Sequence, residues 1–262
     1  MMWQINAAEK MSGLLSDLLD VDEIIIGGSL TTPDELDKYS DADMEIRLAG
    51  NTPIDIKALL AAASEEFAPV FGYEVISHSR KDAIRVCFEN GMRFDLVFRY
   101  PADKKSEEPE PAEYDSFASK IDTAVNQFWF YASLILAKLG RKDNLIAAHL
   151  ALEMCQVIIV IQMLQRDNAK CTNIHRFGDG EDVPVIRRTP QTTGECENIS
   201  LLRRPVLACE TADEILSVVF SAAAHMDNMG KMLTELERTG ATSKYTEKSD
   251  NLNTMARKLL YS

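Results

Sequence analysis

The first hundred residues alternate between helical and extended patterns of apolar positions. Apolar side chains recur at helical spacing over residues 6–20 and 54–67, which predicts two amphipathic helices. Alternating or β-branched runs predict strands in the segments EIIIGGS, DADMEIRL, YEVISHS, AIRVCFE and MRFDLVFRY. An Asn90-Gly91 turn between the last two runs is typical of a hairpin. This half of the chain is therefore predicted to form a small mixed sheet with helices.

The pattern changes after residue 110. The segment PADKKSEEPEP (101–111) is charged, contains proline and has almost no large apolar side chains, which marks a boundary. Long helical patterns then cover residues 115–139, 144–166, 211–238 and 247–260. We predict an α+β chain with a mixed-sheet domain over residues 1–110 and an α-helical bundle over residues 111–262. The functional site is expected in the cleft between them.

Three aspartates are the strongest candidates for chemistry. Asp41 and Asp43 are two residues apart at the start of a predicted strand, so both side chains point the same way. Asp95 lies in the middle of a later strand and could join them. Three ionised carboxylates repel one another unless a hard cation such as Mg²⁺ compensates them. The simpler alternative is that these aspartates cap or solvate the ends of strands.

A Gly-Ser pair ends the first predicted strand, and a gap of eleven residues separates it from Asp41. Gly28 would let the backbone approach a phosphate closely, and Ser29 would offer a hydroxyl and an N–H to it. An ordinary turn explains the pair equally well when it is considered alone. The combination of these features is more specific than any one of them. Their order along the chain is strand, Gly-Ser, gap, Asp-x-Asp, helix and later Asp.

In that order, Gly28-Ser29, Asp41-Ala42-Asp43 and Asp95 resemble the signature of the DNA polymerase β-like nucleotidyltransferase superfamily. YSDAD resembles the SDxD form of its minimal and antibiotic-modifying branches. Residues 125–145, VNQFWFYASLILAKLGRKDNL, are similar to the start of the C-terminal domain in streptomycin 6-adenylyltransferases and lincosamide nucleotidyltransferases. The chain departs from the pattern after Ser29, where many members have a small residue and a glycine.

The resemblance implies that Asp41 and Asp43 bind metal, and that Asp95 binds metal and helps to deprotonate an acceptor hydroxyl. It also implies two Mg²⁺ ions and ATP, or another NTP, as co-substrate. The reaction would be transfer of a nucleoside monophosphate to a hydroxyl of a small molecule, with release of pyrophosphate. Two other classes stay open: an antitoxin-type enzyme that attaches AMP to a protein, and a catalytically silent nucleotide-binding scaffold.

Other residues carry weaker signals. Arg141 and Lys142 lie at a predicted helix junction, where they could reach a triphosphate or could simply be solvated charges at a helix end. Phe128 and Trp129 could line a base or substrate pocket, although core packing explains them better. The loop over residues 173–189 could border the substrate site or be a surface connection.

The net charge of −13 is concentrated in the first domain. Residues 1–110 contain 22 acidic side chains and only 11 basic ones. A strongly acidic domain offers no basic surface that could bind the phosphate backbone of a nucleic acid. We therefore expect no polymeric nucleic acid as partner. The negative charge favours a cationic acceptor such as an aminoglycoside, narrowly over a lincosamide, and a metabolite unrelated to resistance stays open. Most of these carboxylates could equally serve only solubility.

The remaining composition bears on location and assembly. Five cysteines without CxxC spacing argue against a disulfide framework or a zinc site. From the sequence we expect no apolar run long enough to span a bilayer, and the N-terminus does not resemble a signal peptide. We therefore expect a cytoplasmic protein without a membrane partner. The chain could form a homodimer.

Overall fold

The structure is a computed structural model of the 262-residue chain, and it describes residues 3–32, 34, 36–102, 117–169, 209, 211–237 and 245–261. The chain divides into two compact units, Met1–Glu110 and Pro111–Ser262. The loop predicted over residues 173–189 lies outside the described residues, as does most of the segment 101–111.

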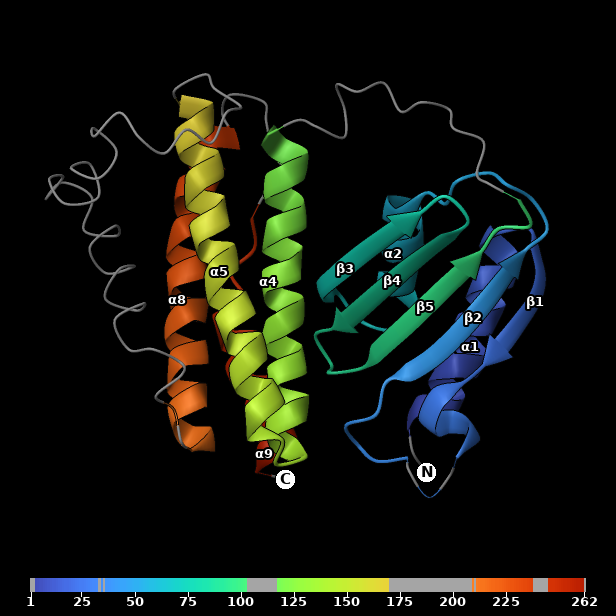
Figure 1. The fold of residues 1–262 in the computed structure, drawn as a ribbon, viewed down its shortest axis with the longest axis horizontal. Coiled ribbons are helices and arrows are strands. Elements are labelled where there is room, and N and C mark those ends of the chain that lie inside the picture. The colour runs from blue at the N-terminus through green and yellow to red at the C-terminus, as the bar shows by residue number, and fades with distance from the viewer. Residues whose placement is uncertain are drawn as a thin grey trace, which may run out of the picture. The chain divides into compact units, whose positions relative to one another are not determined.

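A five-stranded mixed sheet forms the centre of the first unit (Figure 1). Its strand order is β1-β2-β5-β4-β3, and only β2 and β5 are parallel neighbours. The strands are β1 (Val21–Ile26), β2 (Ala42–Leu48), β3 (Val70–His78), β4 (Lys81–Phe88) and β5 (Arg93–Arg99). This order puts the two strands that carry the candidate aspartates side by side in the sheet.

Two helices cover one face of this sheet, as Figure 1 shows: α1 (Trp3–Leu18) and α2 (Ile56–Glu66). Alternation along β2 sends Met44 and Ile46 into the core, where they are 2% and 0% exposed, and leaves Asp43 and Glu45 on the opposite face. Apolar residues of both helices and of the strands fill this core: Ala7, Met11, Leu15, Leu59, Leu60, Ala63, Phe88, Phe94, Leu96 and Phe98. Apolar burial therefore fixes which face of the sheet is free to carry polar groups.

The described part of the second unit is helical. Its helices are α4 (Phe117–Gly140), α5 (Asn144–Ala169), α8 (Ala212–Glu237) and α9 (Ser249–Leu260). Phe128 and Trp129 are completely buried in this unit, which agrees with a packing role for both rings. The predicted fold class, a mixed sheet followed by a helical domain, is confirmed.

One segment of α5 differs from the expectation that no apolar run could span a bilayer. Within the described residues, Asn144–Gln165 is long and apolar enough to do so by length and composition, and less than half of it is buried. Core helices of soluble proteins pass the same test. The segment is therefore weak evidence for a membrane span.

A buried carboxylate ties α8 to the start of α9. Asp227 is 4% exposed and accepts hydrogen bonds from the Tyr245 hydroxyl at 2.8 Å and from the backbone N–H groups of Lys248 and Ser249 at 3.0 and 2.9 Å. Burial and the Asp227 charge raise the pKa of the Tyr245 hydroxyl, which keeps it protonated as a donor. This carboxylate satisfies N–H groups at the start of α9 that have no partner within the helix.

We predict that Asp227→Ala destabilises the helical unit by about 3 kcal/mol, because it leaves buried donors without an acceptor. Tyr245→Phe removes only one of these bonds and should cost about 1 kcal/mol. The exposed Asp213 of the same helix provides the control, since Asp213→Ala leaves the network intact. Urea unfolding followed by circular dichroism measures all three. Equal effects of Asp227→Ala and Asp213→Ala would show that the network does not hold α9.

Candidate functional site

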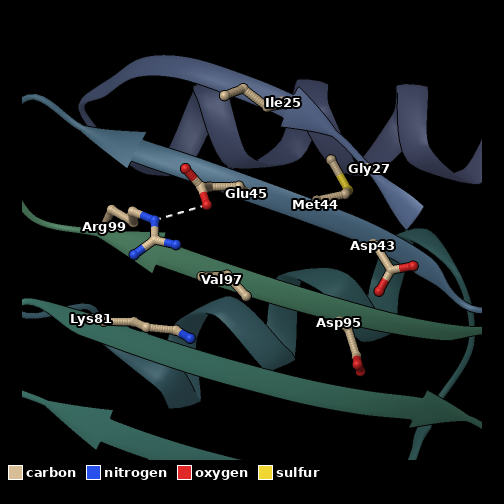
Figure 2. Close-up of a pocket in the computed structure, with 9 residues that line it drawn as sticks. All are labelled: Ile25, Gly27, Asp43, Met44, Glu45, Lys81, Asp95, Val97 and Arg99. Carbon is tan, nitrogen blue, oxygen red and sulfur yellow. Dashed lines mark ion pairs between the residues drawn. The ribbon is translucent and has the colours of Figure 1, made fainter. Parts of the chain in front are cut away.

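The two strands β2 and β5 place Asp43 and Asp95 next to each other. They are register partners across the parallel pair, so their side chains leave the same face of the sheet. This is the face opposite α1 and α2. Figure 2 shows both carboxylates at one end of a hollow on this face.

A glycine turn packs directly against Asp43. Gly28 opens the single 3₁₀ turn Gly28–Thr31 with φ of +58°, and a Cβ built on it would lie 1.8 Å from the Asp43 Oδ2 atom. The N–H of Gly27 also donates to the backbone carbonyl of Asp43 at 2.9 Å. Only glycine fits this position without displacing the turn or the carboxylate. Ser29 follows within the same turn, as the sequence suggests.

The residues just before Asp41 form a turn that is held from two sides. Gln4 of α1 is completely buried, and its Nε2 donates to the carbonyls of Asp37 and Ser40 at 2.7 and 3.2 Å. Arg93 of β5 donates from Nη2 to the carbonyl of Tyr39. Sequence reasoning missed both residues. Gln4 could have been noticed, because it continues the stripe of Ala7, Ala8, Met11 and Leu15 on the buried side of α1.

Asp95 is engaged by an arginine that sequence reasoning also missed. Arg85 of β4 is its register partner on the other side, and the Arg85 Nε atom lies 3.1 Å from each Asp95 oxygen. Arg85 Nη1 lies 3.5 Å from the Glu74 carboxylate. In Figure 2 the Asp95 carboxylate points away from Asp43, toward β4. Asp95 is therefore neutralised within the protein.

Asp41 and Asp43 are not neutralised in this way. Among the described residues, neither carboxylate makes a hydrogen bond or an ion pair. Burial, and then the charges of Asp41 and Asp95, raise the pKa of Asp43 to about 6 despite the opposing effect of Arg85. The pKa of Asp95 is also raised, chiefly by burial, while Arg85 opposes the shift. Negative charge thus accumulates around Asp43, and among the described residues the nearest opposing charge, Arg85, is paired with Asp95.

This arrangement fits a divalent cation in part. In the portion of the chain that the structure describes, no three His, Cys, Asp or Glu side chains are placed so that together they could hold a metal ion. The pair Asp41 and Asp43 supplies hard oxygen donors and uncompensated charge, which are what Mg²⁺ needs. Asp95 lies close enough to raise the pKa of Asp43, but Arg85 holds its oxygens.

The hollow beside these carboxylates is a cavity of about 470 Å³ on the same sheet face (Figure 2). Carboxylates and cations both line it. Its lining residues are Ile25, Gly27, Asp43, Met44, Glu45, Lys81, Asp95, Val97 and Arg99. A cavity of this size accommodates a small ligand.

Arg141 and Lys142 lie in the second unit, between α4 and α5. Both are exposed; Lys142 has φ of +62°, and its N–H donates to the Leu139 carbonyl at 2.9 Å. Asp143 accepts from the N–H of Ile146 at 3.2 Å and so caps α5. These contacts explain the segment as a helix end, and a nucleotide-binding role stays a prediction.

Comparison with known proteins adds little about function. No family model matches the chain, and no curated protein matches it either. The chain is similar to the crystal structure of an aminoglycoside 6-adenyltransferase from Bacillus subtilis, with 13% identity, a TM-score of 0.37, and coverage of 98% of this chain and 97% of that chain. At that identity and TM-score the likeness carries no argument about activity.

We predict that Gly28→Ala destabilises the first unit by about 1–3 kcal/mol, because alanine is strained at this φ and its Cβ meets the Asp43 carboxylate. Gly27→Ala is the matched control. Gly27 has extended backbone angles, and a Cβ there meets nothing within 4 Å. Urea unfolding of both variants tests the prediction. Equal stability of the two variants would refute the close packing of Gly28 on Asp43.

The raised pKa of Asp43 predicts a pH-dependent effect on stability. Because the pKa in the folded chain is about 6 and the ordinary value is 3.8, the folded state binds this proton more tightly. Ionisation of Asp43 therefore lowers the free energy of unfolding. The whole of this loss is present above pH 6, and none of it is present below about pH 4. Asp43→Asn cannot ionise, so in chelator it should unfold at higher urea than wild type at pH 7.5.

The difference should shrink as the pH falls from 6 toward 4. Asp17→Asn, at an exposed position of α1, serves as the control and should follow wild type at every pH. A constant difference between Asp43→Asn and wild type from pH 4 to 7.5 would contradict the raised pKa.

Proposed function

We propose that this chain is a Mg²⁺-dependent nucleotidyltransferase that moves a nucleoside monophosphate, AMP in the first instance, from an NTP to a hydroxyl of a small molecule. The observation that carries the proposal is the uncompensated carboxylate Asp43 with Gly28 packed against it. Asp95 stands in register beside it on the parallel strand. A carboxylate that burial destabilises, next to a backbone turn without a side chain, is expected where a cation and a phosphate bind together.

In this proposal Asp41 and Asp43 hold the divalent ion. When bound, the ion supplies neutralisation of charge on the triphosphate and on the leaving pyrophosphate. The turn Gly28–Thr31 would receive a phosphate beside Asp43, and Ser29 can donate its N–H or hydroxyl to it. Arg141 and Lys142 are proposed as further triphosphate ligands from the second unit.

At the α-phosphorus, the reaction forms one bond and breaks one, and the acceptor hydroxyl loses its proton. The acceptor oxygen bonds to the α-phosphorus, and the bond from that phosphorus to the bridging oxygen breaks. The electron pair leaves with pyrophosphate. We assign to Asp95 the role of accepting the hydroxyl proton, since its raised pKa makes it a better base than an ordinary carboxylate. Arg85 would then position the Asp95 carboxylate and keep it ionised before the proton arrives.

The acceptor that bulk charge favours, narrowly, is an aminoglycoside, with a lincosamide and an unrelated metabolite as alternatives. A pyrophosphate-release screen with ATP, GTP, CTP and UTP against streptomycin, lincomycin and hydroxylated metabolites separates these. Label transferred to a polypeptide would instead identify a protein-modifying enzyme. NTP binding without pyrophosphate release from any acceptor would identify a silent nucleotide-binding protein.

We predict that Asp41→Asn and Asp43→Asn each lower turnover by more than about 100-fold, because loss of even an outer partner of a metal ligand costs 10- to 100-fold. Both variants keep the size of the side chain and should remain folded. Asp17→Asn removes an exposed carboxylate of the same unit and should retain full turnover. Pyrophosphate release at saturating MgATP measures the effect. Full activity of Asp43→Asn would refute the proposed metal site.

A further inference from the structure

The cavity on the sheet face has two ends of opposite charge. Figure 2 shows Asp43 and Asp95 at one end and Lys81 and Arg99 at the other, with Val97 between them on β5. Along β5, Asp95 and Arg99 are four positions apart, which corresponds to about 13 Å of strand. A ligand that fills the cavity therefore meets carboxylates at one end and cations at the other.

Of the two cations, one is already paired. The Arg99 Nε atom lies 2.8 Å from the Glu45 carboxylate, and this hydrogen bond is the main cause that lowers the pKa of Glu45. Glu45 also lies 3.5 Å from Arg47 Nε. The third carboxylate of the cavity is thus neutralised by its own neighbours. It adds no net negative charge for a cationic ligand to meet.

The second cation, Lys81, has no such partner. Among the described residues, its ammonium group makes no hydrogen bond or ion pair. Lys81 is the register partner of Arg99, and Figure 2 shows its side chain extending along the sheet face in the direction of Asp95. An unpaired ammonium at the wall of a cavity is available for an anionic group of a ligand.

The position of Lys81 separates it from the proposed triphosphate site. The turn Gly28–Thr31 follows β1, and β1 is antiparallel to β2, so the turn lies beside Asp43. Lys81 pairs with the far end of β5, at the opposite end of the cavity. A phosphate held by the Gly28 turn would therefore lie at the Asp43 end of the cavity, and Lys81 lies at the other end.

We propose that this cavity is the acceptor subsite, and that the acceptor carries an anionic group, a phosphate or a carboxylate, which Lys81 binds. The reacting hydroxyl lies at the Asp95 end. This inference rests on the proposed nucleotidyl transfer and specifies its acceptor class. It differs from the polycationic acceptor favoured by the net charge of the chain. Apart from the pair proposed for metal and base, the charged side chains that line the cavity are Lys81, Arg99 and Glu45, and Lys81 remains as a positive charge once Arg99 and Glu45 have paired.

Matched acceptors test this proposal in the full chain with MgATP: glucose 6-phosphate and glucuronate against glucose, with streptomycin as the polycation. We expect turnover with an anionic acceptor and a KM for it that rises about tenfold in Lys81→Gln, with the KM for ATP unchanged. Lys81→Arg keeps the charge and should restore most of the affinity. Lys57→Gln removes an exposed lysine of α2 and serves as the control.

A second measurement does not depend on turnover. Lysines ¹³C-methylated in the metal-free protein are titrated with inorganic phosphate in chelator, and Lys81→Arg identifies the Lys81 signal by its loss. We expect the Lys81 signal to shift at millimolar phosphate while that of Lys57 does not. If the signal shifts but no acceptor is turned over, the anion site stands and the proposed nucleotidyl transfer fails.

Three results would overturn the proposal. The first is turnover of glucose or streptomycin in preference to the anionic acceptors, with no effect of Lys81→Gln. The second is a rise in the KM for ATP in Lys81→Gln, which would assign Lys81 to the triphosphate. The third is a Lys81 signal that does not respond to phosphate.

Discussion

The parallel pairing of β2 with β5 is the contact on which the candidate site depends. It brings Asp43 and Asp95 into register although 52 positions separate them in the chain. Apolar burial maintains the pairing, because Met44, Ile46, Phe94 and Leu96 from the same two strands pack on the other face beneath α1 and α2. The period of two along a strand then leaves both aspartates on the open face. The same β2–β5 register therefore determines both the packing of the core and the positions of the two aspartates.

Placing carboxylates this close has an electrostatic cost, and the protein offsets only part of it. Arg85 compensates Asp95, whereas Asp41 and Asp43 have no compensating partner among the described residues. Sites that hold a charge imbalance of this kind are typical of functional positions, because the missing charge is supplied by a ligand. Neighbouring residues keep these carboxylates in position. Gln4 and Arg93 donate hydrogen bonds to the turn before Asp41, and Gly28 has no side chain that would collide with Asp43.

The distribution of charge matters more than its total. The first domain carries a large negative excess, yet the cavity beside the aspartates is lined at its other end by Lys81 and Arg99. Long-range attraction follows the summed charge, while selection of a bound ligand follows the groups within contact distance. Bulk charge and local charge therefore favour different acceptors for the same proposed reaction.

The sequence by itself determined the elements and the first group of candidate residues. Apolar periodicity located the strands and helices to within a few residues, because burial of one face imposes a period that can be read from the chain. The paired aspartates and the Gly-Ser turn could be found because they are local patterns. Gln4 was missed since the predicted helix began at residue 6, whereas α1 begins at Trp3.

Tertiary structure alone decided which residues face one another. A two-residue Asn90-Gly91 turn would have paired Arg85 with Leu96. Instead the loop has three residues, with Gly91 at φ of +89°, and Arg85 pairs with Asp95. A shift of one residue would put apolar side chains opposite polar ones, so the register depends on the turn and on the packing of the buried face together. The salt bridge to Asp95 and the cavity that ends at Lys81 are products of pairing between distant segments, so they became visible only in the folded chain.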